Sequence, residues 1–310
     1  MLESVFDDTL LSSINLLNNA GLYELRIRAS KPCIVNYFNK YYFLGKNGLE
    51  SEKEKAFYFS NSDISNIIAR ASNFSLYAIN EQLKKGFISC ENGIRIGVCG
   101  EEVCEDEQVI TLKNISSLVF RFPHEIKGVS EKVIDYLFSN NEFCNTIILS
   151  SPGNGKTTLL RDLIRMLASK EYAKNVLVID ERNELSASCD GNSSFDLGLF
   201  SDIYLNENKQ RAILNGVRSL APDIIATDEI GTKQDIESLL YLSTCGVRIL
   251  ATLHAESIED LLNKADFDSI ISQKVFKRYI VLSNKNGKGT VENIFDENFN
   301  STFKEKAVWN

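Results

Sequence analysis

The feature that most constrains the fold is a glycine-rich segment at residues 150–158, between a short apolar run and a run with helical spacing. Glycines in such a loop let backbone amides point at a polyphosphate, and the N-terminus of the following helix adds a favourable partial charge. The segment consists of Ser150, Ser151, Pro152, Gly153, Asn154, Gly155, Lys156, Thr157 and Thr158. We therefore predict a phosphate-binding loop, in which Lys156 reaches the β- and γ-phosphates and Thr157 offers its hydroxyl to Mg²⁺. ATP and Mg²⁺ are the expected cofactors.

One position of this loop departs from the Walker A pattern, which has glycine where this chain has Ser150. Either Ser150 accepts the geometry that opens the loop, or its hydroxyl joins the groups around the phosphates. The alternative interpretation of the whole segment is a glycine-rich turn with a solvated lysine. A strand before the loop and a helix after it favour the nucleotide site.

The C-terminal half alternates short apolar runs with helical patterns. Short apolar runs separated by helices predict a parallel sheet covered on both faces. The predicted strands are 146–150, 176–179, 223–227 and 247–253, and the predicted helices are 156–169, 209–220, 235–245 and 257–265. Residues 279–282 and 291–295 flank the turn-rich segment 284–289, which predicts a terminal hairpin.

The N-terminal half has a different pattern, which predicts a smaller α+β domain. We expect an amphipathic helix over 2–17 and a second helix that Asp63 caps and that ends near Asn73. The predicted strands are 22–28, 33–44 with a break at Asn39, 87–90 and 94–99 around a turn at Asn92, and 117–122. Residues 131–143 link the halves, so the predicted domains are 1–130 and 131–310.

Composition excludes several classes of protein. The seven cysteines form no CxxC pair and there are only two histidines, which argues against a zinc site or a disulfide framework and favours a reducing compartment. The N-terminus is acidic where a signal peptide is basic, and no apolar run approaches the ~20 residues that span a bilayer. The net charge of −8 and the lack of a basic stripe argue against direct nucleic-acid binding. We expect a cytoplasmic protein that reaches a membrane only through a partner.

Two adjacent acids follow the third predicted strand of the C-terminal half. Asp228 and Glu229 come directly after the apolar run 224–227, at the edge where open α/β sheets place their sites. Asp228 would hold Mg²⁺ through water, and Glu229 would orient or deprotonate an attacking water. The alternative is a helix cap beside a surface acid. Paired acids favour hydrolysis over binding alone.

The second and fourth predicted strands also end in polar residues. Asp180–Glu184 is either a source of a carboxylate near the γ-phosphate, from Glu181 or Glu184, or a solvated loop with a cap. A lone histidine is more often structural than functional. Because four parallel strands end in polar residues at one edge, we interpret His254 as a donor that senses the γ-phosphate.

These four stretches together resemble the secretion-ATPase branch of RecA-like P-loop proteins, which drive type II and type IV secretion and pilus machines. That branch has a Walker A loop, an acidic "Asp box", a Walker B strand and a "His box" in this order. The resemblance is closest to a sporulation family of endospore-forming bacteria and covers about residues 20–283. The strings that carry it are Leu25-Arg26-Ile27-Arg28, residues 93–100, Ile115-Ser116-Ser117-Leu118, Asp180-Glu181-Arg182, Arg218-Ser219 with Pro222-Asp223, and Asp228-Glu229-Ile230-Gly231.

The resemblance implies a cytoplasmic hexameric motor in the mother cell, at the base of a secretion-like channel into the forespore. Its partners would be copies of itself and membrane-embedded channel components, with no direct nucleic acid. Matching positions assign Lys156 and Thr157 to the nucleotide site, Glu229 to Walker B, Glu184 to the Asp box and His254 to the His box. Relatives often have Gly-Glu where this chain has Asp228-Glu229, and the CxxC zinc module of some pilus ATPases has no counterpart here.

Secretion ATPases also use arginines that cross a subunit boundary. Arg218 is the first candidate for this role and Arg211 the second, since both precede Walker B. Arg182, in the Asp box, and Arg121, in the N-terminal half, are further candidates. Two other functions remain open at this point. RecA-like sheets also drive nucleic-acid ATPases, which composition opposes, and a small-molecule kinase would need a lid segment that the sequence does not show.

Overall fold

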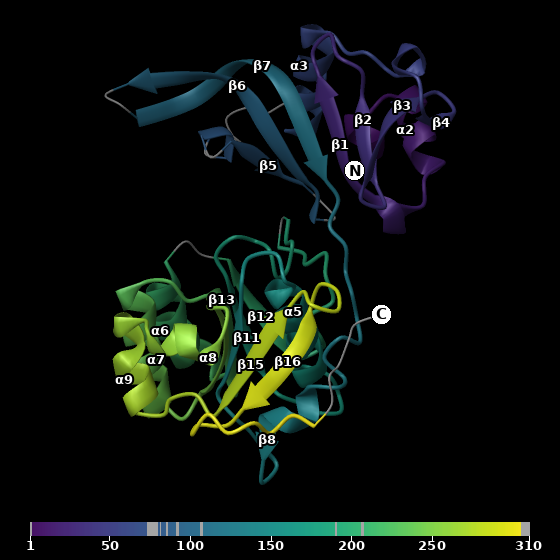
Figure 1. The fold of residues 1–310 in the computed structure, drawn as a ribbon. Coiled ribbons are helices and arrows are strands. Elements are labelled where there is room, and N and C mark those ends of the chain that lie inside the picture. Colours follow the sequence, from purple (N-terminus) through teal and green to yellow (C-terminus); the bar gives the residue numbers. More distant parts are fainter. Residues whose placement is uncertain are drawn as a thin grey trace. The chain divides into compact units, whose positions relative to one another are not determined.

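A computed structural model describes residues 2–304 apart from 73–79, 81, 85, 91–92, 106–107, 190 and 206–207. The chain forms two compact units, and each is considered by itself (Figure 1). The N-terminal unit runs to His124 and includes Ala187–Ser194. The C-terminal unit comprises Glu125–Ser186 and the chain from Phe195 onward. In the described part of the chain, no helix is both long and apolar enough to cross a bilayer.

An antiparallel sheet organises the N-terminal unit. Its described strands run in the order β4-β3-β2-β1-β7-β6-β5, and each pairs antiparallel with its neighbours. They are β1 (Leu22–Arg28), β2 (Ile34–Tyr37), β3 (Lys40–Gly45), β4 (Gly48–Glu50), β5 (Phe87–Ser89), β6 (Arg95–Glu105) and β7 (Gln108–Arg121). The predicted hairpin is present as the β5–β6 pair, although its turn residue Asn92 lies outside the described residues. β6 and β7 are longer than the sequence predicted.

The helices of this unit begin at polar caps. They are α1 (Leu2–Val5), α2 (Asp8–Asn15) and α3 (Asn61–Ala71). A single helix over 2–17 is therefore wrong, because the Asp7 carboxylate accepts the Leu10 amide at 2.8 Å and starts a second helix there. The predicted cap of α3 is also displaced. Ser60 is the cap, and Asp63 completes a capping box from the third position. The predicted end near Asn73 lies outside the described residues.

A mostly parallel sheet forms the centre of the C-terminal unit, as the alternating pattern predicted. Its described strands run in the order β12-β11-β13-β14-β10-β15-β16, and only β16 is antiparallel to its neighbour. They are β10 (Thr146–Ser150), β11 (Val176–Asp180), β12 (Ser201–Leu205), β13 (Ile224–Glu229), β14 (Arg248–His254), β15 (Arg278–Ser283) and β16 (Thr290–Phe295). The terminal hairpin is confirmed as β15–β16, and β12 was not predicted.

Helices cover this sheet on both faces because successive residues of each strand point to opposite sides. Ile148 and Val178 pack with α5 on one face, and Ile147 and Leu177 pack with the remaining helices on the other (Figure 1). The helices are α5 (Lys156–Leu167), α6 (Lys209–Leu220), α7 (Lys233–Thr244), α8 (Ile258–Leu262) and α9 (Asp268–Ser272). A small hairpin, β8 (Phe138–Ser139) with β9 (Glu142–Phe143), precedes β10. The carboxyl ends of β10, β11, β13 and β14 therefore meet at one edge.

Candidate nucleotide site

The loop after β10 has the geometry that a phosphate-binding loop requires. Gly155 is the N-cap of α5 and has φ 90°, in the left-handed region that favours glycine. A Cβ built on Gly153 would meet no atom within 4 Å, so space lies open beside this stretch of backbone. Ser150 is buried at the end of β10, and its hydroxyl donates to the Ser151 carbonyl oxygen at 2.8 Å. Serine thus accepts the position where glycine is usual.

Lys156 opens α5 and links the loop to the neighbouring strand β14. Its Nζ donates to the Ser150 carbonyl oxygen at 3.0 Å and lies 2.8 Å from His254 Nδ1. Burial lowers the pKa of Lys156 below its ordinary value, while the charges of Glu229 and Asp228 oppose that shift. An ammonium group only donates, so Nδ1 of His254 is the acceptor and the neutral ring carries its proton on Nε2.

The Nε2 atom of His254 faces the acid pair at the end of β13. It lies 3.4 Å from Glu229 Oε1, and the other carboxylate oxygen of Glu229 lies 3.1 Å from an Arg182 guanidinium nitrogen. The series Lys156, His254, Glu229 and Arg182 therefore joins the P-loop to the Asp box across two further strands. This series brings together residues from all four of the predicted stretches.

Asp228 precedes Glu229 at the end of β13, and both side chains are partly buried. Burial raises the pKa of Asp228 to about 6, and the negative charges of Glu184 and Asp180 act in the same direction. The guanidinium of Arg182 opposes the shift. A site that crowds carboxylates in this way gains from a divalent cation, which offsets their mutual repulsion.

A pocket of about 500 Å³ lies at this edge of the sheet. It gathers most of the predicted site residues and three residues that were not predicted as site residues, Ile126, Thr252 and Lys288. Its lining is Ile126, Pro152, Gly153, Gly155, Lys156, Thr157, Thr158, Arg182, Glu184, Asp228, Glu229, Thr252, His254 and Lys288. Of the predicted loop residues, Ser150, Ser151 and Asn154 are not in that lining, and the Ser151 hydroxyl donates to Glu256 at 3.0 Å.

The acids of the Asp box, residues 180–184, have different surroundings: one is buried and structural, and the others line pockets. Asp180 is buried and caps its own loop, since its carboxylate accepts the Glu184 amide at 2.9 Å and the Ser186 amide at 2.8 Å. Glu184 lines the nucleotide pocket. Glu181 instead lies 3.1 Å from Lys209 Nζ and lines an adjoining pocket of about 310 Å³. Glu184 is therefore the Asp-box acid best placed for the nucleotide.

Lys209 is a buried cation that the sequence analysis did not single out. Its Nζ donates to the Glu229 carbonyl oxygen at 2.6 Å and lies 3.1 Å from both Glu181 and Asp235. These bonds fix the backbone that carries Glu229. The sequence did contain one sign of this role. Lys209 falls in the first turn of a predicted helix, where a positive charge opposes the helix dipole and needs a compensating acidic partner.

Of the candidate interface arginines, Arg182 is part of the pocket lining, and the other three lie apart from it. Arg211 and Arg218 are exposed on α6, and neither lines the nucleotide pocket. Because α6 runs from the carboxyl edge of the sheet to the opposite edge, Arg211 lies nearer the pocket edge than Arg218. Arg121 ends β7 in the N-terminal unit, where its Nε is 3.6 Å from Glu24.

The donors at this edge fit MgATP. The Thr252 hydroxyl is buried at the pocket and has no hydrogen-bond partner among the described residues. Open backbone at Gly153 and the N-terminus of α5 suit phosphate oxygens. Asp228 and the Thr157 hydroxyl supply the oxygen ligands that Mg²⁺ prefers.

Comparison with known proteins supports this reading of the fold. The structure is similar to the pilus retraction motor PilT with bound ADP, with a TM-score of 0.60, 15% identity and coverage of 89% of this chain and 78% of that one. It is also similar to the ATPase DotB of Legionella pneumophila, with a TM-score of 0.54, 15% identity and coverage of 84% and 72%. The C-terminal unit thus has a RecA-like α/β fold, and a smaller α+β unit precedes it.

Sequence comparison identifies the family. The chain is 31% identical over 290 residues to stage III sporulation protein AA of Bacillus subtilis (strain 168), which covers 92% of this chain and 90% of that protein. Residues 9–301 match the family described as "Sporulation stage III, protein AA". The chain therefore belongs to the sporulation stage III protein AA family.

Proposed function

We propose that this protein hydrolyses ATP and acts as the motor of a secretion-type machine. One observation carries the proposal: Lys156 at the start of α5, Glu229 of β13 and His254 of β14 line one pocket, where His254 lies 2.8 Å from Lys156 and 3.4 Å from Glu229. A structural histidine or a solvated lysine would need no such arrangement. The same pocket contains Thr157 and Asp228, which suit Mg²⁺.

Each residue has a role that follows from its chemistry. MgATP, when bound, supplies the phosphoryl group and the charge of the metal. Lys156 exchanges its bonds to backbone oxygen and His254 for phosphate oxygens. Glu229 is the general base that takes a proton from water, and the Nε2–H of His254 orients its carboxylate. Thr157 and Asp228 hold Mg²⁺, and Glu184 adds a carboxylate beside them.

The role in a machine is proposed from the family and from the fold. The relative in Bacillus subtilis is named as a sporulation protein, and the two similar structures are named as an ATPase and a pilus retraction motor. We place the protein in the cytoplasm, as a homo-oligomer with six subunits. It would dock through membrane-embedded channel components at the sporulation channel between mother cell and forespore.

The activity is tested by measuring phosphate release with MgATP for the wild type and for Glu229→Gln. The amide keeps the shape of the side chain but cannot accept a proton. We expect turnover to fall by about 10²-fold or more while affinity for a non-hydrolysable ATP analogue is kept. Single-turnover hydrolysis at the wild-type rate would show that Glu229 is not the base, and would move that role to Glu184.

The motor is distinguished from a nucleic-acid ATPase by the same assay with single-stranded DNA or RNA added. We expect no stimulation, because the net charge is −8 and the pocket lining has as many carboxylates as cations. A several-fold rise in rate with either polymer would favour the nucleic-acid function.

A further inference from the structure

The turn between β15 and β16 carries a lysine into the nucleotide pocket. Lys288 lines the same pocket as Lys156 and Thr157, although about 130 residues separate them along the chain. The sheet order explains this proximity. β15 pairs in parallel with β10, so the turn after β15 lies at the same edge as the loop after β10.

The turn is held in a defined shape. Gly287 has φ 111°, a value that L-residues rarely adopt, and its amide donates to the Asn284 carbonyl oxygen at 3.2 Å. The Thr290 hydroxyl donates to the Gly287 carbonyl oxygen at 2.8 Å and fixes the start of β16. Lys288 lies between these anchors, on an exposed stretch of the turn.

The charged residues of the pocket distinguish Lys288 from the other cations there. Three cations and three carboxylates line the described pocket. Two of the cations already have partners, since Arg182 pairs with Glu229 and Lys156 bonds His254 and backbone oxygen. Among the described residues no carboxylate pairs with Lys288. It is therefore the cation of this pocket that a further anion can engage without displacing a partner.

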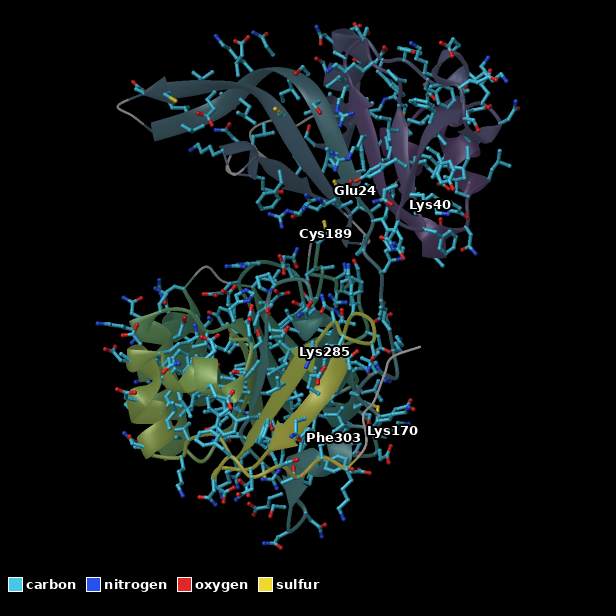
Figure 2. The ribbon with its side chains drawn as sticks, viewed as in Figure 1. Glu24, Lys40, Lys170, Cys189, Lys285 and Phe303 are labelled. Atoms are coloured by element: carbon cyan, nitrogen blue, oxygen red, sulfur yellow. The ribbon has the colours of Figure 1, made fainter. Side chains whose placement is uncertain are left out.

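A second lysine of the same turn is a natural comparison. Lys285 lies 3.5 Å from Glu292 and does not line the pocket. Figure 2 shows Lys285 at the turn of the β15–β16 hairpin. The two lysines thus share a loop and a charge but differ in partner and in access to the pocket.

We propose that Lys288 is a second phosphate-binding lysine, which contacts the polyphosphate of the nucleotide from the β15–β16 turn. This inference rests on the proposed ATP site and adds a binding residue to it. A nucleotide with more phosphate charge gains more from the contact, so Lys288 favours ATP over nucleotides with fewer phosphates. The contact also couples the C-terminal hairpin to nucleotide occupancy, because the turn that joins β15 and β16 carries Lys288.

The test measures binding of a non-hydrolysable ATP analogue with Mg²⁺ by isothermal titration. Lys288→Met keeps the aliphatic stem and removes only the charge. We expect its dissociation constant to rise by about tenfold, the effect of losing one charge-assisted contact, and Lys288→Arg to bind within about threefold of the wild type. Lys285→Met is the matched control and should bind like the wild type. The loss in Lys288→Met should be smaller for ADP than for the ATP analogue.

The outcomes separate this inference from the proposed function. If the wild type binds, Lys156→Ala does not, and Lys288→Met binds as well as Lys285→Met, the second-lysine contact is refuted and the ATP site stands. If the wild type itself fails to bind, the proposed function fails first. Equal losses in both turn variants would assign the effect to hairpin structure and would also overturn the inference.

Discussion

At the scale of single residues, His254 lies between Lys156 of the proposed phosphate site and Glu229, the proposed general base. Nδ1 accepts from Lys156 at 2.8 Å, and Nε2 lies 3.4 Å from Glu229. A phosphate that binds Lys156 would therefore change the hydrogen bond that His254 accepts, and His254 also faces Glu229, to which the proposed mechanism gives the activation of water. Glu229 also contacts Arg182, so its carboxylate has a cation on one side and a neutral donor on the other.

We predict that His254→Ala lowers turnover by about 10²-fold, an effect typical of removing one preorganised donor from a reacting centre. ATP affinity should change less, because Lys156 keeps its backbone contacts and its access to phosphate. His124→Ala is the matched control, since the ring of His124 bonds the Leu22 carbonyl oxygen in the N-terminal unit. Rates and dissociation constants should be measured for both variants. A wild-type catalytic rate in His254→Ala would assign that histidine to structure.

Sequence patterns located the acids of this site but could not separate their roles. Asp180, Glu181 and Glu184 lie within five residues, yet one caps a loop, one pairs with Lys209 and one lines the pocket. Which way each carboxylate points depends on the turn after β11 and on residues of α6. Lys288 was missed for the same reason, because only the order of strands brings it to the P-loop.

At the scale of elements, α5 is fixed by a buried carboxylate. Asp162 accepts the Ser130 amide at 2.8 Å and hydroxyl at 2.7 Å, and it accepts Arg165 Nε at 2.8 Å. Burial acts to raise the pKa of Asp162, but the Ser130 and Arg165 donors outweigh it and hold that pKa below its ordinary value. Since α5 begins at Lys156, this cluster also steadies the P-loop.

We predict that Asp162→Asn lowers the free energy of unfolding by about 2–3 kcal/mol, because hydrogen bonds to a charged group are lost and the new amide faces donors. Urea denaturation at pH 7 measures the change, with exposed Asp202→Asn as the control. A depressed pKa gives stability that is present above the unfolded value of about 4 and is lost as pH falls through the folded value. The difference in the free energy of unfolding between the wild type and Asp162→Asn should therefore become smaller below pH ~4. A gap that does not depend on pH would show that the carboxylate charge is not responsible.

Most elements of the C-terminal unit were predictable because buried strands and amphipathic helices have distinct periods. β12 was missed, since Ser201–Leu205 is a half-exposed edge strand with no continuous apolar run. The lengths of β6 and β7 were also missed. Glu101 and Glu102 are adjacent exposed acids on β6, and they interrupt the alternation of apolar and polar residues that predicts a strand. Local propensity could not reveal these strands, since pairing with a neighbour forms them.

At the scale of the whole molecule, the proposed motor needs contacts that one chain does not complete. Charge develops on a transferring phosphoryl group, and an arginine from a second subunit can add about 10³–10⁵ in rate. Arg211 and Arg218 are seven residues apart on α6, about two helical turns, so they lie on one exposed face. Sequence position favoured Arg218 as the arginine that reaches a second subunit. Because α6 begins at the pocket edge of the sheet, Arg211 lies nearer that edge and is the better candidate.

We predict that Arg211→Ala and Lys156→Ala are each inactive alone and regain activity when mixed. In a closed ring with random order, about one quarter of the interfaces pair an intact P-loop with an intact arginine, so the mixture should reach about that fraction of the wild-type rate. Arg218→Ala mixed with Lys156→Ala shows whether the second arginine of the same face has this role. Specific activity of the wild type should also rise with protein concentration as subunits associate. A rate per subunit that stays flat from the monomer range upward, with no recovery in either mixture, would mean that each chain holds a complete site and that the oligomeric motor is wrong.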